Sequence, residues 1–185
     1  MNTIKVITPL TKEACQQLRA GDRVLITGKI YTARDAAHLR LLNLIEKNET
    51  LPLDFDGQVI YYAGPSPSRP GAVIGACGPT TSYRMDDITK PLLDLGLKGM
   101  IGKGDRSDLV IAEMMENGAV YFAAIGGAGA LISSCIKSNT IIAFEELGPE
   151  ALRCLEVVDF PAIVAIDING NDLYKTEPDR YKINT

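Results

Sequence analysis

Apolar positions along the chain follow two patterns, and together they predict a protein in which strands alternate with helices. Short apolar or β-branched runs are typical of strands, whereas longer stretches with one apolar stripe are typical of amphipathic helices. The strand pattern occurs at residues 23–30, 59–63, 72–75, 99–101, 119–125, 140–144, 152–158 and 162–168. The helix pattern occurs at 33–47, at 84–95, in a segment ending at Asn117 and after the Gly/Ala-rich turn that begins at Gly126. Residues 1–22 fit a short strand followed by a turn or helix.

Local motifs add detail to this pattern at two places. Thr32 and Asp35 resemble a capping box at the start of the helix predicted over 33–47, although that motif prefers Glu or Gln at its last position. Asn169-Gly170 suits a type I′ turn, so residues 162–174 are expected to end as a hairpin. We therefore predict a layered α/β domain with a mixed sheet and a C-terminal hairpin.

Composition narrows the classes of protein that the chain can belong to. It has 185 residues, 46% hydrophobic and 23% charged, which fits one domain, or one domain and a small appendage, and excludes disorder as its main state. The formal net charge of −4 argues against a nucleic-acid-binding protein, which needs a cationic surface. No apolar run reaches the roughly 18 residues of a membrane span, so no membrane partner is expected.

The cysteines and the single histidine argue against a metal centre built by this chain. Cys15, Cys77, Cys135 and Cys154 contain no CxxC pair, and residues 1–11 do not read as a secretory leader. We therefore expect a cytoplasmic protein with reduced thiols. One histidine, His38, cannot supply a multi-histidine metal site. Cys77 is better explained as a small buried thiol than as a nucleophile or metal ligand.

Three turn-to-helix junctions share one composition that favours an anion. They comprise Thr32–His38 with Arg34, Gly78–Arg84 with Thr80, Thr81, Ser82 and Arg84, and Gly102–Ser107 with Lys103 and Arg106. Each offers free backbone N–H groups at a helix start and adds a long cationic side chain. If two or three of these junctions face one another, they form a pocket for a small dicarboxylate or a phosphate ester.

Each junction also has a simpler interpretation. A Gly-Pro-Thr-Thr-Ser turn is usually only a cap, and a single arginine is usually a solvated surface charge. The glycines around Lys103 and those at 126–129 fit neither the phosphate-loop nor the dinucleotide-loop motif, and close packing explains the second group better. The acidic pairs Asp86-Asp87 and Glu145-Glu146 are interpreted as solvated edges or helix-start charges.

Four segments in order along the chain resemble a known family. They are TGKIYTARDAAH (27–38), GPTTSYRMD (78–86), GKGDRS (102–107) and DFPA (159–162), and GPTT-x-x-RMD is the most specific. Together they resemble the β subunit, or C-terminal half, of the class I iron–sulfur fumarate hydratases, a family that includes the L-tartrate dehydratase β subunit. The resemblance runs from about Lys5 to Tyr174 and favours a single domain over 1–185.

The resemblance implies a hydro-lyase that adds water to, or removes it from, a four-carbon dicarboxylate. It implies a [4Fe–4S] cluster held by three cysteines of a separate α subunit, with an open iron that acts as a Lewis acid. We expect this chain to bind no cluster by itself. It is expected to adopt the family's swivelling β/β/α domain and to close over the cluster of its partner in a hetero-oligomer.

The resemblance also implies roles for residues in the three junctions. Arg34 and Arg84 correspond to substrate-carboxylate binders, and Lys103 corresponds to a third cationic contact. Thr80 corresponds to the hydroxyl that helps proton transfer, a role that Thr81, here taken as substrate-binding, is also placed to fill. Asp35 and His38 match the RDAAH run and are expected to hold Arg34 in place. Tyr83 stands where the family often has a small residue.

Three functions are consistent with these residues and with the resemblance. The first is the β subunit of a fumarate hydratase, and the second is the β subunit of an L-tartrate dehydratase. The third is a dicarboxylate-binding module without catalysis, which predicts that the isolated chain binds dicarboxylates well. Under either enzyme hypothesis, the isolated chain is expected to bind dicarboxylates weakly until the α subunit completes the site.

Overall fold

The computed structural model describes residues 3–180 of the chain, with side chains up to residue 178. The seven strands of the sheet are β1 (Thr3–Ile7), β2 (Arg23–Thr32), β3 (Val59–Tyr61), β4 (Gly99–Gly102), β5 (Val120–Ala123), β6 (Ile136–Ala143) and β7 (Leu152–Ile166). The α-helices are α1 (Lys12–Gln17), α2 (Asp35–Glu46), α3 (Asp86–Asp94), α4 (Asp108–Asn117), α5 (Gly129–Cys135) and α6 (Leu173–Arg180). Two 3-10 segments, η1 (Ser82–Met85) and η2 (Glu145–Glu150), complete the elements. Within this described part, no helix is long and apolar enough to cross a membrane.

The sheet is mixed and curls back on itself. Strands β1 to β5 pair side by side in parallel, in the order β1-β2-β3-β4-β5. The long strand β7 then pairs antiparallel with β5, with β6 and again with β2. The pairings of β2, β3, β4, β5 and β7 therefore form a closed ring.

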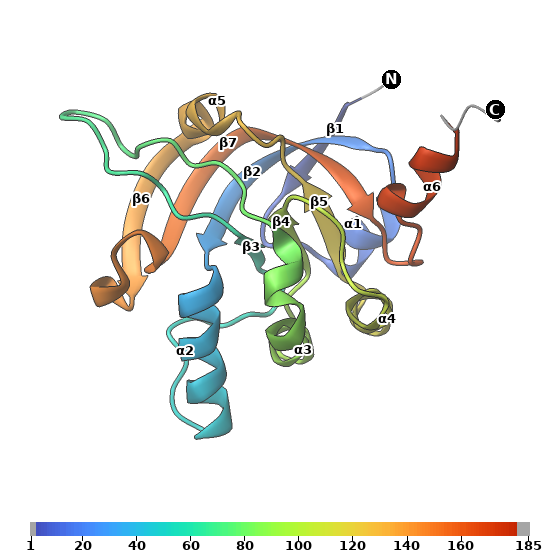
Figure 1. Cartoon of the computed structure of the whole chain (residues 1–185), viewed down its shortest axis with the longest axis horizontal. Helices are drawn as coiled ribbons and strands as arrows, with labels where there is room; N and C mark the ends of the chain where they lie inside the picture. The colour runs from blue at the N-terminus through green and yellow to red at the C-terminus, as the bar shows by residue number, and fades with distance from the viewer. Residues whose placement is uncertain (1–2, 181–185) are drawn as a thin grey trace.

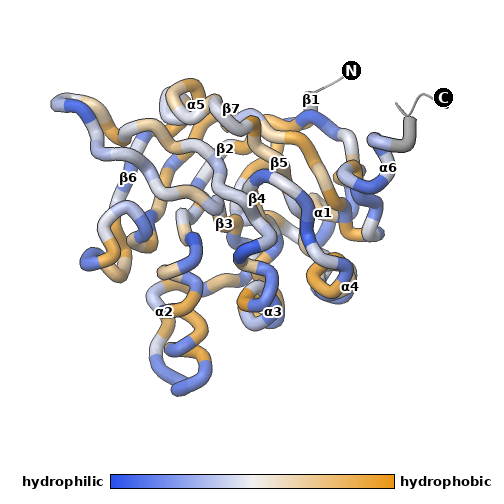
Figure 2. The backbone as a smooth tube through the Cα atoms, in the orientation of Figure 1, coloured by the Kyte–Doolittle hydropathy of each residue, from blue (hydrophilic) through white to orange (hydrophobic). Residues whose placement is uncertain are grey.

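The two faces of this sheet bury two separate cores. Because strand residues alternate between faces, Val59 and Tyr61 belong to one core, and Ile60 and Tyr62 to the other. The first core lies inside the curled sheet and includes side chains from α1 and α5. The second core lies beneath α2, α3 and α4, which stand side by side on the other face (Figure 1). Figure 2 shows the hydrophobic segments gathered in the strands and on the helix faces that meet them.

The parallel arrangement determines where functional side chains can meet. The carboxyl ends of parallel strands lie at one edge of the sheet, and the loops that follow them converge there. Arg34 follows β2, Gly64 follows β3, Lys103 follows β4 and Gly126 follows β5. The fold therefore brings loops from separate parts of the chain to one edge.

Most of the predicted elements are confirmed, including the helix over 33–47 and the strands beginning at residues 23, 59 and 99. The strand predicted at 72–75 is wrong, because this segment lies in a loop that folds back on itself. Ser66 donates its backbone N–H to the Ala76 carbonyl at 3.0 Å. A Cβ added to Gly75 would lie 2.2 Å from the Ser66 carbonyl oxygen, so the two arms of the loop touch through backbone.

The predicted C-terminal hairpin is reduced to one bridge, between Ile166 and Asp172. The Asp167 carboxylate accepts the backbone N–H groups of Asn169 and Asn171, and this side chain ties the turn before α6 begins. The strands predicted at 152–158 and 162–168 are one strand, β7, which passes through Asp159 at φ 53° without ending. The predicted mixed sheet and its antiparallel pairing near the end of the chain are confirmed.

Candidate functional site

The Gly-Pro-Thr-Thr segment at residues 78–81 extends the sheet edge between β3 and β4. Thr80 donates its backbone N–H to the Tyr62 carbonyl at 2.7 Å, just beyond β3. Its own carbonyl accepts the N–H of Lys103 at 3.2 Å, just beyond β4. Thr81 and Lys103 form a parallel bridge. Backbone hydrogen bonds therefore place both threonines beside Lys103.

Close approach at this edge requires a glycine in β4. A Cβ added to Gly102 would lie 1.9 Å from Ser82 Oγ and 2.9 Å from the ring of Tyr62. The Ser82 hydroxyl hydrogen-bonds the Tyr121 hydroxyl at 2.8 Å, which in turn donates to the Gly104 carbonyl at 2.8 Å. These contacts hold the start of η1 against β4 and β5.

Two arginines from separate junctions meet at Asp35. Arg84 Nη2 lies 3.3 Å from Asp35 Oδ2 and donates a 2.5 Å hydrogen bond to Thr80 Oγ1. Arg34 Nε lies 3.7 Å from the same carboxylate oxygen. The structure thus brings together Arg34, Asp35, Thr80 and Arg84. Both guanidinium groups are partly exposed, with side-chain exposures of 28% and 38%, so they can reach a ligand.

Lys103 contributes a third positive charge to the cluster. Its side chain is exposed and passes Gly126, where an added Cβ would lie 4.0 Å from Nζ. Among the side chains that the structure describes, no carboxylate lies within 4.0 Å of this ammonium group. Arg84 is thus the cation that contacts the Thr80 hydroxyl, Arg34 joins it through Asp35, and Lys103 lies beside Thr81 through the backbone bridge.

His38 supports the backbone beneath Arg34 and does not face solvent. Its Nδ1 lies 3.1 Å from the Arg34 carbonyl, and its ring packs edge-on against Tyr62 at a centroid distance of 5.4 Å. Burial lowers the pKa of His38 to about 4, so the ring is neutral at pH 7. The tautomer with hydrogen on Nδ1 fits this contact, since a carbonyl can only accept.

The capping box predicted for Thr32 and Asp35 is wrong. Helix α2 has Arg34 at its N-cap position without a side-chain cap, and the Thr32 hydroxyl is buried without a partner. The Ala36 N–H donates instead to Glu150 Oε2 at 3.0 Å. Glu150 Oε1 accepts from Arg34 Nη2 at 2.8 Å. Glu150 was not predicted from the sequence, because it lies more than a hundred residues further along the chain.

Arg106, which the third junction offered as a cation for the pocket, belongs to the core. Its Nε donates to Asp86 Oδ1 at 2.6 Å, its Nη2 donates to Thr89 Oγ1 at 2.8 Å, and its guanidinium lies over the rings of Tyr62 and Tyr121. Asp86 is therefore the partner of a buried cation and, as expected, a carboxylate at a helix start. Glu146 fits the predicted solvated edge, because it pairs with the exposed Arg40.

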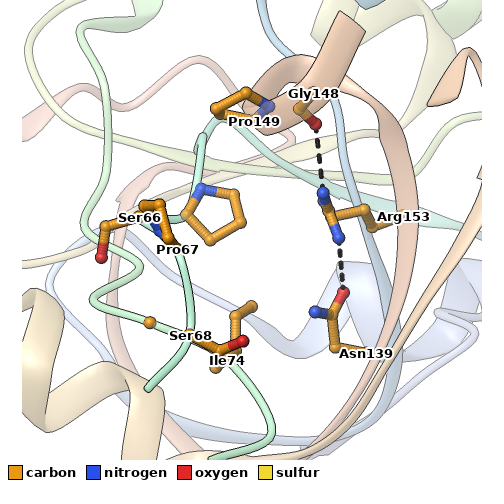
Figure 3. A pocket seen from close by; sticks show the side chains of 10 residues that line it. Ser66, Pro67, Ser68, Ile74, Asn139, Gly148, Pro149 and Arg153 are labelled. Atoms are coloured by element: carbon orange, nitrogen blue, oxygen red, sulfur yellow. Dashed lines mark hydrogen bonds between the residues drawn. The ribbon is translucent and has the colours of Figure 1, made fainter. Parts of the chain in front are cut away.

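A hollow of about 350 Å³ lies between the 65–75 loop and the end of η2 (Figure 3). Arg153 reaches its wall, where it donates to the Asn139 side-chain oxygen and the Gly148 carbonyl. None of the predicted site residues lines this hollow. The candidate site is therefore the cluster at the sheet edge.

The residues present do not fit an iron–sulfur cluster. In the described part of the chain, no group of three or more His, Cys, Asp or Glu side chains is placed to hold a metal ion. The cysteines are free thiols in separate parts of the fold: Cys15 in α1, Cys77 in the loop before η1, Cys135 in α5 and Cys154 in β7. Burial raises the pKa of Cys15 to about 11 and that of Cys77 to about 12, so Cys77 is the inert buried thiol that the sequence favoured.

Residues 1–177 match the model of the family described as fumarase C-terminus, and the chain belongs to this family.

The chain is similar both to a protein that it covers almost completely and to longer proteins that it covers in part. A protein of Methanocaldococcus jannaschii named "Putative L(+)-tartrate dehydratase subunit beta" is 40% identical over 90% of this chain and 88% of its own length. Fumarate hydratase 2 of Leishmania major is 37% identical over 88% of this chain. The anaerobic class I fumarate hydratase of Escherichia coli is 38% identical over 86% of this chain. The matched region spans 29% of the length of each of these two hydratases.

Proposed function

We propose that this chain is the β subunit of a two-component hydro-lyase that interconverts fumarate and (S)-malate. One observation carries the proposal. Arg34, Arg84 and Lys103 come from three separate junctions to one sheet edge, where Arg84 contacts Thr80, Arg34 and Arg84 share Asp35, and Lys103 bridges Thr81. A four-carbon dicarboxylate has two negative groups, and two guanidinium groups with a nearby ammonium group complement them.

The contacts in the cluster support a division of roles. Arg34 and Arg84 are partly exposed and would bind substrate carboxylates, with Lys103 as a third cation and Thr81 beside it. The hydrogen bond from Arg84 to Thr80 Oγ1 stabilises negative charge on that oxygen and directs the hydroxyl hydrogen elsewhere. Thr80 is accordingly the group proposed to assist proton transfer at the substrate carbon next to a carboxylate. A threonine hydroxyl is a weak base, so a further group must assist it.

The remainder of the site belongs, in this proposal, to another polypeptide. The family resemblance assigns a [4Fe–4S] cluster to an α subunit, and the thiols of this chain do not form a ligand set for it. We propose that residues 1–185 form one domain of the swivelling β/β/α type, which closes over the cluster of the α subunit in a cytoplasmic hetero-oligomer. The relative from Methanocaldococcus jannaschii supports this proposal, since its name is that of a subunit beta.

L-Tartrate is the second candidate substrate. The relative that this chain covers almost completely carries the name of a tartrate dehydratase subunit. Tartrate and malate differ by one hydroxyl group, and both would present two carboxylates to Arg34 and Arg84. We propose that Tyr83, which is 60% exposed and adjoins Arg84 in the sequence, influences which of the two substrates is accepted.

Anaerobic co-expression with the cysteine-bearing α chain of the same genome tests the proposal. The complex is expected to hydrate fumarate, whereas dehydration of L-tartrate without fumarate hydration would support the second candidate. Activity on neither substrate, together with tight dicarboxylate binding by the isolated chain, would contradict both and indicate a module without catalysis.

A matched pair of variants links that activity to the cluster. Arg84→Ala removes a carboxylate partner and is expected to cost ~2 kcal/mol or more in transition-state binding, at least about 30-fold in kcat/KM. Lys90→Ala removes a cation from α3 that pairs with Asp94 on the surface, and it is expected to leave activity unchanged. An unchanged kcat/KM for Arg84→Ala would remove this residue from the site.

A further inference from the structure

Glu150 lies at the end of η2 and connects it to the start of α2. Its two carboxylate oxygens have different partners: Oε1 accepts from Arg34 Nη2 at 2.8 Å, and Oε2 accepts from the Ala36 N–H at 3.0 Å. The side chain is 25% exposed, so both bonds are shielded from water to a large degree. Glu150 accepts at the N-terminus of α2, where a negative charge is favourable. This favourable interaction offsets the repulsion between the carboxylates of Glu150 and Asp35.

The guanidinium group of Arg34 has two further neighbours, Gly64 and Asp35. A Cβ added to Gly64 would lie 2.8 Å from Arg34 Nη1 and 3.3 Å from the Pro149 carbonyl oxygen, so the guanidinium packs directly against backbone. Its Nε points toward Asp35 at 3.7 Å without a hydrogen bond. Among the described residues, the bond to Glu150 is the one hydrogen bond that the guanidinium makes.

We infer that Glu150 is a positioning residue for Arg34. It fixes the guanidinium through one N–H of Nη2 and leaves the second N–H of Nη2 and those of Nη1 to bind a substrate carboxylate. This inference rests on the proposed function, in which Arg34 binds that carboxylate. A long arginine side chain loses much rotamer freedom when it binds a ligand, and prior fixation by Glu150 removes part of this cost.

If Glu150 competed with the substrate for Arg34, its removal would have the opposite effect on substrate binding. If Glu150 occupied the place of the substrate carboxylate and had to leave on binding, its removal would tighten binding. A purely structural role, which only joins η2 to α2, would lower stability and leave the KM of the folded enzyme unchanged. Measurement of KM and kcat therefore separates the three roles.

The test uses the assembled enzyme with its α subunit. Glu150→Ala is expected to raise KM for the dicarboxylate at least ~10-fold, with a smaller change in kcat. Glu150→Gln, whose amide oxygen still accepts one of the two hydrogen bonds, is expected to fall between this variant and the wild type. Glu146→Ala is the matched control, since Glu146 also joins η2 to α2, through Arg40 at 2.6 Å, but on an exposed surface.

A double variant shows whether Glu150 acts through Arg34. The KM of Arg34→Ala/Glu150→Ala is expected to equal that of Arg34→Ala alone, because fixation is meaningless without the guanidinium. Independent, additive losses would overturn the inference, as would an unchanged or lowered KM in Glu150→Ala. If that variant does not assemble, an unchanged KM in Glu150→Gln overturns it equally.

Failure of the inference and failure of the proposed function give different results. A wild-type KM in Arg34→Ala would show that this arginine binds no carboxylate, which would count against the proposed site itself. A raised KM in Arg34→Ala with a wild-type KM in Glu150→Ala and Glu150→Gln would overturn only the role of Glu150.

Discussion

The three cations of the candidate site are held by different kinds of contact. Arg34 is fixed by a carboxylate from η2, Arg84 lies between Asp35 and the Thr80 hydroxyl, and Lys103 pairs with no described carboxylate. Lys103 is accordingly the most adaptable of the three. At this scale, the proposal predicts that Arg34 and Arg84 determine the geometry of binding and that Lys103 adds charge.

His38 gives a prediction for stability. Its pKa is lowered from 6.5 to about 4 because the ring is buried. Between these values the unfolded chain binds a proton that the folded chain does not, so stability falls as pH decreases from about 6.5 to 4. The full effect is ~3 kcal/mol. The pH dependence of the unfolding free energy, from urea titrations at pH 7 and pH 4.5, is expected to be smaller in His38→Gln. Equal pH dependence in the two proteins would contradict the neutral buried ring.

The sequence predicts a candidate-site residue only where a local motif marks it, and it cannot show which distant residues contact it. Arg34 and Arg84 stand at helix starts with polar turns, and family motifs assign their positions. Arg106 has the same local setting but is buried, because Asp86 and two tyrosine rings surround it in three dimensions. Glu150 carries no local signal, because its partners lie far away in the sequence.

At the scale of elements, one buried ion pair joins the end of β4 to α3 and α4. Arg106 follows β4 and bonds to Asp86 and Thr89 of α3. The other oxygen of Asp86 accepts the N–H of Ser107, the N-cap residue of α4. The Arg106–Asp86 pair therefore fixes the starts of α3 and α4 relative to the sheet edge that carries the candidate site.

Arg106→Met tests this connection. It leaves the Asp86 carboxylate largely buried without its cation, which is expected to lower the unfolding free energy by ~3–5 kcal/mol. The midpoint of urea unfolding measures the effect. Lys90→Met is the control on the same helix: it removes a solvent-exposed pair with Asp94 and is expected to change the midpoint little. A wild-type midpoint in Arg106→Met would show that the pair is not needed.

Element prediction succeeded where periodicity is local and failed where tertiary contacts decide. The helix and strand patterns at 23–47 hold in the structure. The apolar run at 72–75 has the residues of a strand, but backbone contacts to Ser66 keep it in a loop. The turn near Asn169 forms, but no second strand follows it, because the Asp167 side chain takes the turn N–H groups and α6 begins at Leu173.

At the scale of the whole molecule, the chain presents a cluster of cations and hydroxyls at one edge of its sheet. It matches nearly the full length of a named β subunit and about a third or less of the fumarate hydratases. The proposed function divides one active site between two polypeptides. Binding of a diacid should then require both.

Calorimetric titration of succinate, a four-carbon diacid that cannot gain or lose water, tests this division of the site. The isolated chain and the anaerobically assembled complex are titrated side by side, with the Arg84→Ala complex as the control. We predict binding no tighter than about millimolar by the chain alone, binding at least ~10-fold tighter by the complex, and loss of that gain in Arg84→Ala. Equal affinity of the isolated chain and the complex would contradict a site shared between two polypeptides.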